Sequence, residues 1–284
     1  MIHSFLMLGQ SNMAGRGFVS QVPPIYNERI QMLRNGRWQM MTEPINYDRP
    51  VAGVSLASSF ADAWSSAHQE EIIGLIPCAE GGSPIEDWQP EGALFQHAIS
   101  QAKFAMKNSQ LSGLLWHQGE SNSMAGGTTD YYDKLLVIVK ALRKELAAPD
   151  LPLIIGGLGN YLGEIGFGAG CKEYQTINDA LQRFAFEQGN CYFVTAAELT
   201  SNPDGIHLDA ISQRRFGLRY FEAFQHQQHV LAPLPHEEKT LSDMAKRPHT
   251  QNEKIYLASL EMAMGEIPYS EFEARVAALY QKQA

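Results

Sequence analysis

Short apolar runs alternate with amphipathic segments along most of this chain, and this alternation limits the folds open to it more than any other feature. Each run has the length of a buried strand and no polar alternation, which is typical of strands covered on both faces. The segments between them carry apolar residues at the spacing of an amphipathic helix. The runs are residues 2–8, 72–77, 113–116, 153–157 and 191–195, and the helical segments are 56–68, 94–107, 131–146, 174–186 and 211–224.

Five alternations of strand and helix predict a doubly wound α/β fold. Helices long enough to cross over give right-handed connections, so we expect a five-stranded parallel sheet inside a three-layer α/β/α sandwich. Ligands bind such sheets at the carboxyl ends of the strands. Two irregular segments occupy this edge: residues 18–54, with no clear period, and the glycine-rich residues 159–170. The second lacks a GxGxxG frame, so we expect a flexible, substrate-facing loop rather than a dinucleotide-binding loop.

The chain has 284 residues, more than one such sandwich requires. Near Val230 its character changes, because prolines and histidines precede a helical pattern over residues 252–280. We therefore predict one domain at residues 1–230 and a C-terminal helical extension at residues 231–284. The extension could pack on the domain or on a second subunit in a homo-oligomer, and both arrangements fit the sequence. The histidines at 226, 229 and 236 lack a Cys or carboxylate frame, so no metal site is expected there.

Charge and cysteine content narrow the range of partners. The formal net charge of −9 leaves no basic footprint for nucleic acid and discourages binding to anionic membranes. No apolar stretch approaches the ~18–20 residues of a membrane span. The apolar N-terminus has no basic leader or cleavage site, which predicts a cytoplasmic protein unless a leader has been removed. Three widely spaced cysteines fit no disulfide or CxxC pattern, and we expect them to be buried.

Polar side chains follow the first and fifth predicted strands, at the edge where ligands are expected. Ser11 lies in the motif GQSNMAG at residues 9–15, and its hydroxyl either acts as a nucleophile or only caps a helix. Asp204 and His207 are three residues apart, so one tight loop lets the carboxylate accept the imidazole Nδ1 proton and orient a general base. The alternative is a surface turn with an incidental histidine, since Pro203-Asp204-Gly205 is a strong turn signal.

Two more segments end strands at the same edge. Gly81-Gly82-Ser83 follows the second strand, and Trp116-His117-Gln118-Gly119-Glu120 follows the third. A glycine lets a backbone N–H approach a substrate oxygen, and a glutamine side chain supplies an amide donor, so together with the Ser11 N–H they predict a three-donor oxyanion hole. Glycines that only shape a turn, and a core histidine at 117, are the alternatives. Because all four segments lie at the same edge of the predicted sheet, an active site is favoured over these alternatives.

These four blocks, in this order over residues 2–225, resemble those of the SGNH hydrolases. The blocks GQSNMAGRG, GGS, WHQGE and DGIHL resemble the version found in family-6 carbohydrate esterases and sialate O-acetylesterase-like domains. The resemblance implies a flavodoxin-like fold and metal-free removal of acetyl groups from carbohydrates. It also makes Ser11 the nucleophile, His207 the general base and Asp204 the residue that orients it.

The resemblance further implies an oxyanion hole of the Ser11 and Gly82 N–H groups and the Gln118 side chain. Gly82 is favoured over Gly81 because it sits deeper in the turn. Glu120 either organises its loop or competes with Asp204 for the histidine. Asn12, next to the nucleophile, is a further supporting candidate.

The implied activity is that of a serine esterase that removes O-acetyl groups from carbohydrates through an acetyl-enzyme. Its substrate would be a small-molecule or oligosaccharide acetyl ester, and no cofactor is needed. Trp38, Tyr47 and Arg49 either form a sugar platform or pack their own loop. Three alternatives remain: a non-catalytic carbohydrate-binding protein, an esterase of small non-sugar acyl esters, and a flavodoxin-like nucleotide-binding protein. The last is disfavoured because residues 9–15 contain no GxxxxGK[ST] loop.

Overall fold

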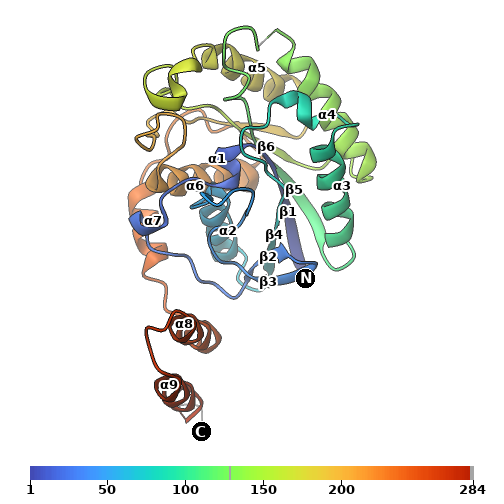
Figure 1. The fold of residues 1–284 in the computed structure, drawn as a ribbon. Coiled ribbons are helices and arrows are strands. Elements are labelled where there is room, and N and C mark those ends of the chain that lie inside the picture. Colours follow the sequence, from blue (N-terminus) through green and yellow to red (C-terminus); the bar gives the residue numbers. More distant parts are fainter. Residues whose placement is uncertain (128, 282–284) are drawn as a thin grey trace.

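A mostly parallel sheet of seven strands forms the centre of the protein, as seen in a computed structural model that describes residues 1–127 and 129–281 (Figure 1). The strand order is β3-β2-β4-β1-β5-β6-β7, and every pair except β2–β3 is parallel. The five predicted strands are all present. They are β1 (Ile2–Gly9), β4 (Ile72–Pro77), β5 (Gln110–His117), β6 (Leu153–Gly156) and β7 (Cys191–Val194).

The predicted count of five strands is wrong, because the segment from 18 to 54 adds a hairpin to one edge. Strands β2 (Ile30–Arg34) and β3 (Arg37–Met40) are antiparallel to each other, and β2 also pairs with β4. Asn35 and Gly36 form the two-residue turn with φ of 52° and 73°. Both residues at the centre of a type I′ turn need positive φ, which is why Asn-Gly is a hairpin signal and not only a chain breaker.

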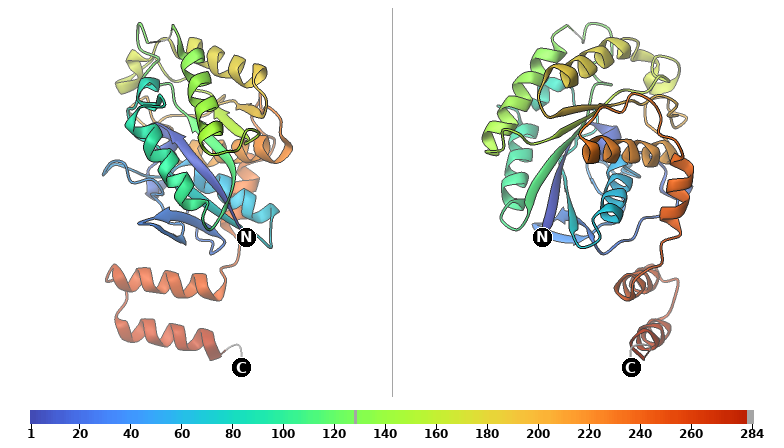
Figure 2. Two further views of the ribbon diagram at one scale, coloured as in Figure 1. Left: turned by 90° about the vertical axis from the view of Figure 1, so that its right-hand side faces the viewer. Right: turned by 180° about the vertical axis from the view of Figure 1, so that it is seen from behind.

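Helices cover both faces of the sheet (Figures 1 and 2). On one face, α2 (Leu56–Ala67) and α6 (Ala210–His226) pack against Phe5 and Met7 of β1. On the other face, α3 (Ala93–Ala105), α4 (Tyr131–Glu145) and α5 (Tyr174–Glu187) enclose Leu6 and Leu8. All four β1 side chains are fully buried. Successive side chains of a strand point to opposite faces, so an uninterrupted apolar run requires the three layers that were predicted.

Four short helices lie at or near the carboxyl edge of the sheet, and three longer ones follow the sandwich. The short ones are α1 (Ser11–Ala14), η1 (Val19–Gln21), η2 (Ile85–Trp88) and η3 (Gly166–Gly170). The C-terminal helices are α7 (Glu237–Ala245), α8 (Gln251–Ala263) and α9 (Tyr269–Gln281).

The C-terminal helices attach to the sandwich in two ways. Helix α7 lies against α6, where Arg219 Nε meets Glu237 Oε1 at 2.6 Å. Helices α8 and α9 form a hairpin that projects from the body (Figure 2). Within residues 1–127 and 129–281, no helix has both the length and the apolar character needed to cross a membrane.

Candidate active site

Ser11 opens the short helix α1 directly after β1, at the carboxyl edge of the sheet. The residue is only 4% exposed, and its Oγ makes no hydrogen bond to any other described residue. The turn is fixed by the backbone, because the Gln10 N–H donates to the His117 carbonyl at the end of β5 (2.9 Å). A serine hydroxyl without a protein partner, close to a strand end, is free to meet a base and a substrate.

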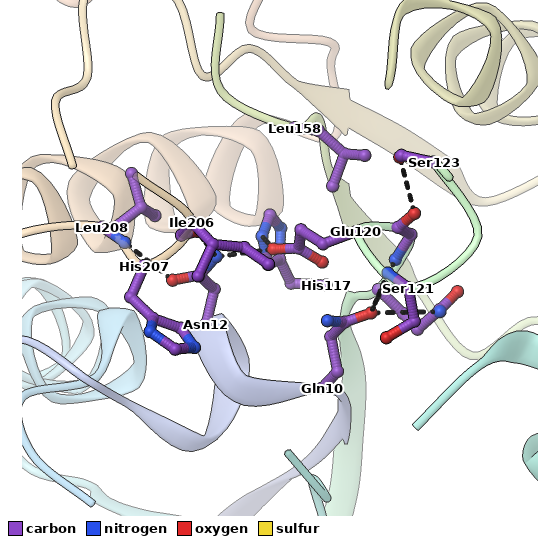
Figure 3. Close-up of polar contacts among 12 residues, drawn as sticks. Gln10, Asn12, His117, Glu120, Ser121, Ser123, Leu158, Ile206, His207 and Leu208 are labelled. Atoms are coloured by element: carbon purple, nitrogen blue, oxygen red, sulfur yellow. Dashed lines mark hydrogen bonds and ion pairs between the residues drawn. The ribbon is translucent and has the colours of Figure 1, made fainter. Parts of the chain in front are cut away.

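Asn12 joins the Ser11 turn to the loop that carries His207 (Figure 3). Its Nδ2 donates to the Ile206 carbonyl at 3.1 Å, and its Oδ1 accepts the Leu208 N–H at 2.8 Å. These two residues flank His207, and Asn12 itself is fully buried. The side chain next to the serine therefore holds both neighbours of the histidine, which fixes the two loops against each other.

Asp204 and His207 form the predicted pair within one tight loop. The imidazole Nδ1 lies 2.8 Å from Asp204 Oδ2, while Asp204 Oδ1 accepts the N–H groups of Ile206 and His207 at 3.0 Å each. Burial alone raises the pKa of Asp204, but the two N–H groups and the imidazole outweigh it, so that the pKa lies below its ordinary value. An ionised carboxylate on Nδ1 leaves Nε2 as the nitrogen that can take a proton.

The glycine-rich segment after β6 supports this loop from behind. Gly168 lies so close to the Asp204 turn that a Cβ there would be 1.8 Å from the Gly205 carbonyl oxygen, and the Phe167 N–H donates to the Asp204 carbonyl at 2.8 Å. The segment is therefore packed against the Asp–His loop rather than extended over open space. Phe167 itself is 76% exposed beside that loop.

The two backbone N–H groups of the Gly81-Gly82 turn, both candidate oxyanion donors, differ in whether they are already hydrogen-bonded. The Gly81 N–H donates to Asp48 Oδ2 at 2.8 Å, so it is already occupied. Gly82 has φ of +80°, open space where a Cβ would stand, and no hydrogen bond from its N–H to any described residue. Of the two N–H groups, that of Gly82 is therefore the one without a partner among the described residues. Nothing in the sequence singled out Asp48, which lies in the segment without a clear period.

The side-chain amide of Gln118, the third expected oxyanion donor, is hydrogen-bonded within the protein. The residue is fully buried, and its Nε2 donates to Gln10 Oε1 (3.2 Å), the Ser83 carbonyl (3.2 Å) and Asn122 Oδ1 (2.8 Å). Its Oε1 accepts the hydroxyl of Tyr131 at 2.8 Å. An amide with two hydrogens and these acceptors around it has none left for a substrate. Its observed role is to tie three loops together.

Gln10 was missed by the sequence reasoning, although it precedes Ser11 in the first motif. Its Oε1 also accepts the N–H groups of Gly119 and Ser121, at 3.3 and 3.2 Å (Figure 3). One side-chain oxygen thus anchors the loop after β5 to the turn that carries Ser11. Only its place within the motif could have indicated this role.

Glu120 is buried next to Asn12, and its contacts are those of a residue that organises its loop. Its Oε1 accepts from Asn12 Nδ2 at 2.5 Å and lies 3.1 Å from His117 Nε2 (Figure 3). Burial raises the pKa of Glu120, but His117 and the Asn12 hydrogen bond outweigh it and keep the pKa below its usual range. The contacts of this carboxylate are with Asn12 and His117, whereas Asp204 holds His207.

A hollow of about 500 Å³ opens beside Gly82 and includes Arg49, Glu86 and Ala93 in its wall. Arg49 and Glu80 in this wall form an ion pair, with Nη1 and Oε1 2.5 Å apart. Tyr47 is 73% exposed. Trp38, by contrast, packs over β4, where a Cβ on Gly74 would meet its ring at 2.7 Å. Packing of the hairpin, and not a sugar platform, explains Trp38.

The remaining expectations concern cysteines and metal ligands. All three cysteines are buried, as predicted, and their thiols are free. Across residues 1–127 and 129–281, no group of three or more His, Cys, Asp or Glu side chains is arranged to hold a metal ion.

A mostly parallel sheet with a serine, an Asp–His pair and a glycine turn at its carboxyl edge is the arrangement expected of an esterase of the SGNH kind. The family model described as carbohydrate esterase, sialic acid-specific acetylesterase, matches residues 1–226, and the chain belongs to this family. It is thus a carbohydrate esterase, a hydrolase of carboxylic esters.

Individual relatives agree with this assignment. A probable carbohydrate esterase of Arabidopsis thaliana is 27% identical over 242 residues, which cover 78% of this chain and 89% of the relative. The X-ray structure of a protein from the same Arabidopsis locus has a TM-score of 0.71 at 28% identity and covers 79% of this chain and 98% of that one. The crystal structure of NanS, with a TM-score of 0.64 at 18% identity, covers 80% and 97% and shares the fold.

Proposed function

We propose that the protein removes O-acetyl groups from carbohydrates by a two-step serine mechanism. His207 takes the proton of Ser11 as the hydroxyl attacks the acetyl carbonyl, and Asp204 holds the imidazole in the required tautomer. The protonated imidazole then gives its proton to the departing sugar hydroxyl. Water repeats the cycle on the acetyl-enzyme and releases acetate. The observation that carries this proposal is the double hydrogen bond of Asn12 to the two neighbours of His207.

The negative charge that develops on the acetyl oxygen is stabilised by backbone N–H groups of Ser11 and Gly82. This choice is supported by the Gly81 N–H being occupied by Asp48 and by the three acceptors around the Gln118 amide. Each donor that points at a developing oxyanion lowers the barrier by roughly 2.7–4 kcal/mol.

The substrate class rests on family membership and on the hollow beside Gly82. We expect the sugar to lie in this hollow with its acetyl group toward Ser11. Purified protein should be screened with acetylated xylo-oligosaccharides, O-acetylated sialic acids and simple acetyl esters. Turnover of the simple esters alone would favour the small non-sugar alternative.

All residues with a role in this mechanism lie between Ser11 and His207. We accordingly assign the esterase to residues 1–230 and give the extension from 231 to 284 no part in the chemistry. The boundary is supported by the matched range, which ends at residue 226, and by Val230, which bridges to Val194 at the sheet edge.

Replacement of the nucleophile tests the mechanism directly. Ser11→Ala should abolish turnover of p-nitrophenyl acetate, and rapid quenching of the parent should show one added acetyl group on the peptide that contains Ser11. Ser112→Ala is the matched control, because Ser112 lies in β5 and its hydroxyl bonds to the Gln110 carbonyl (3.3 Å) near the opposite end of the sheet. Full activity in Ser11→Ala, or acetylation elsewhere, would remove the proposed nucleophile.

A further inference from the structure

A buried ion pair between Arg16 and Asp48 lies beneath the candidate oxyanion turn. Arg16 Nη2 is 2.6 Å from Asp48 Oδ2, and Arg16 Nη1 is 3.1 Å from Asp48 Oδ1. The side chains are 6% and 2% exposed. Desolvation of two charges offsets most of their attraction, so a buried pair is weak evidence for stability alone. The groups that this pair holds in place are therefore more informative than the pair itself.

The pair connects the nucleophile turn to the oxyanion turn. Asp48 Oδ2 accepts the Gly81 N–H at 2.8 Å, one residue before the Gly82 N–H. Arg16 Nη1 also donates to the Gly15 carbonyl at 2.8 Å, just beyond the Ser11 helix. Two backbone segments that supply the two oxyanion donors are thus fixed by one planar fork and one carboxylate.

The loop of the general base is attached to the same residue. Asn202 Nδ2 donates to the Arg16 carbonyl at 2.9 Å, and the Asn202 N–H donates to the His207 carbonyl at 2.7 Å. Arg16 therefore has a link to all three parts of the proposed mechanism.

The contact between the pair and the glycine turn leaves no spare room. A Cβ on Gly81 would lie 2.4 Å from Arg16 Nη2 and 2.7 Å from Asp48 Oδ2. The ion pair consequently touches the Cα of Gly81 directly, and a shift of either charged group moves the peptide that carries the Gly82 N–H.

We propose that Arg16 and Asp48 are positioning residues that hold the Gly82 N–H in line with the Ser11 N–H around the developing oxyanion. The inference rests on the proposed function of Ser11 and Gly82. Neither charged side chain touches the substrate. Since a misplacement of about 1 Å can cost about 100-fold in rate, loss of the pair should act on kcat rather than on KM.

The test replaces the pair by apolar residues of similar size, because this exchange is often neutral for stability. The double variant Arg16→Met/Asp48→Leu should lose about 10–100-fold in kcat on p-nitrophenyl acetate, with KM nearly unchanged. Binding of phenylboronic acid, whose tetrahedral adduct with the nucleophile places an oxygen among the oxyanion donors, should weaken by a similar factor. Arg16→Lys, which keeps the charge but not the fork, should lose less than Arg16→Met.

Arg219 and Glu237 provide a matched control away from the site. They too form a buried two-bonded pair, at 2.6 and 3.1 Å, and Glu237 Oε1 also accepts a backbone N–H, that of Leu234, at 3.0 Å. Arg219→Met/Glu237→Leu should keep parental kcat even where its change in melting temperature equals that of the Arg16→Met/Asp48→Leu variant. The inference is overturned if the Arg16/Asp48 double variant keeps parental kcat, or if both double variants lose kcat in proportion to their loss of stability. Full activity of Ser11→Ala would instead refute the proposed function.

Discussion

The carboxyl edge of the sheet and the α8–α9 hairpin both lie outside the apolar layers, yet they are attached in different ways. At the edge, Asn12, Gln118 and Glu120 are at most 1% exposed and bond to loops from distant parts of the chain. In the hairpin, α8 buries only Glu253 and Ala258, and α9 buries no residue. The edge is thus built as an interior of polar groups, whereas the hairpin is a surface element.

A buried carboxylate helps to attach the hairpin to the body, together with a hydrogen bond from Asn252 Nδ2 to Glu28 Oε2 (2.7 Å) and a ring contact between Tyr26 and Tyr256. Glu253 is fully buried and accepts the N–H groups of Glu28 and Thr250 and a bond from Arg247 Nη2, each at 2.9 Å. Side-chain bonds from several loops fix both distances and angles at the edge, whereas the contacts of the hairpin hold a surface element that takes no part in the proposed chemistry. We therefore expect changes at the edge to alter catalysis, and changes in the hairpin to alter stability alone.

The largest effect should come from Asp204→Asn. The amide cannot hold the imidazole in the tautomer that accepts the Ser11 proton, so kcat should fall by about 10⁴-fold, as is typical when this carboxylate is replaced in a catalytic triad. Steady-state kinetics on p-nitrophenyl acetate measure it. Glu253→Gln is the matched control, and it should keep parental kcat. Equal losses of kcat in the two variants would show that the edge and the hairpin do not differ in their effect on catalysis.

The sheet could be predicted from the sequence because each of its central strands contains a continuous apolar run, such as Phe5–Leu8 of β1. The β2–β3 hairpin was not predicted, because its strands are only five and four residues long and lie within a segment that shows no clear period over its whole length. Only Asn35-Gly36 pointed to it. The local signal of a turn outweighed the lack of periodicity in the flanking residues.

At the site, the residues that a short loop brings together were predictable, and those fixed by distant contacts were not. Asp204 and His207 are three residues apart, and their 2.8 Å contact was expected from that spacing. The use of the Gln118 amide by Gln10, Ser83 and Asn122 depends on the assembled fold. The same holds for Asp48, whose partner Gly81 is 33 positions away.

A smaller effect is expected from Glu253→Gln, and it should appear in stability. The amide nitrogen of the variant cannot accept the bonds that the carboxylate accepts, so unfolding should become easier by about 1–3 kcal/mol. Thermal or urea denaturation measures the change. A change below this range would mean that Glu253 does not secure the hairpin.

The difference in stability between the parent and Glu253→Gln should depend on pH, because the Glu253 carboxylate titrates. Burial raises the pKa of Glu253, but the two N–H groups and Arg247 outweigh it, so the folded-state pKa is lowered. A lowered pKa gives stability that is complete above the unfolded value, near about 4.3, and that is lost as the pH falls through the folded value. The gap in melting temperature between parent and Glu253→Gln should be widest at neutral pH and close in acid. A gap that widens below about pH 4 would contradict this sign.

Phe167→Ala should have a still smaller effect, limited to substrate binding. The ring is 76% exposed beside the Asp204 loop, where it can cover a sugar face. Loss of such a contact should raise KM for an acetylated oligosaccharide by about 2–5-fold, with kcat retained. Phe186→Ala is the control, since Phe186 is 55% exposed on α5 but stacks on His229. A fall in kcat would mean that the loop supports Asp204 through this ring.

Removal of α9 should change least of all. A chain that ends after Ile267 loses a helix with no buried residue, so its free energy of unfolding should stay within about 0.5 kcal/mol of the parent and kcat should not move. Light scattering on the same variant tests the arrangement in which the extension joins two subunits. If the parent is a dimer and the truncated chain a monomer, α9 is buried between subunits. The hairpin would then be buried like the carboxyl edge of the sheet, but its cover would come from a second copy of the chain.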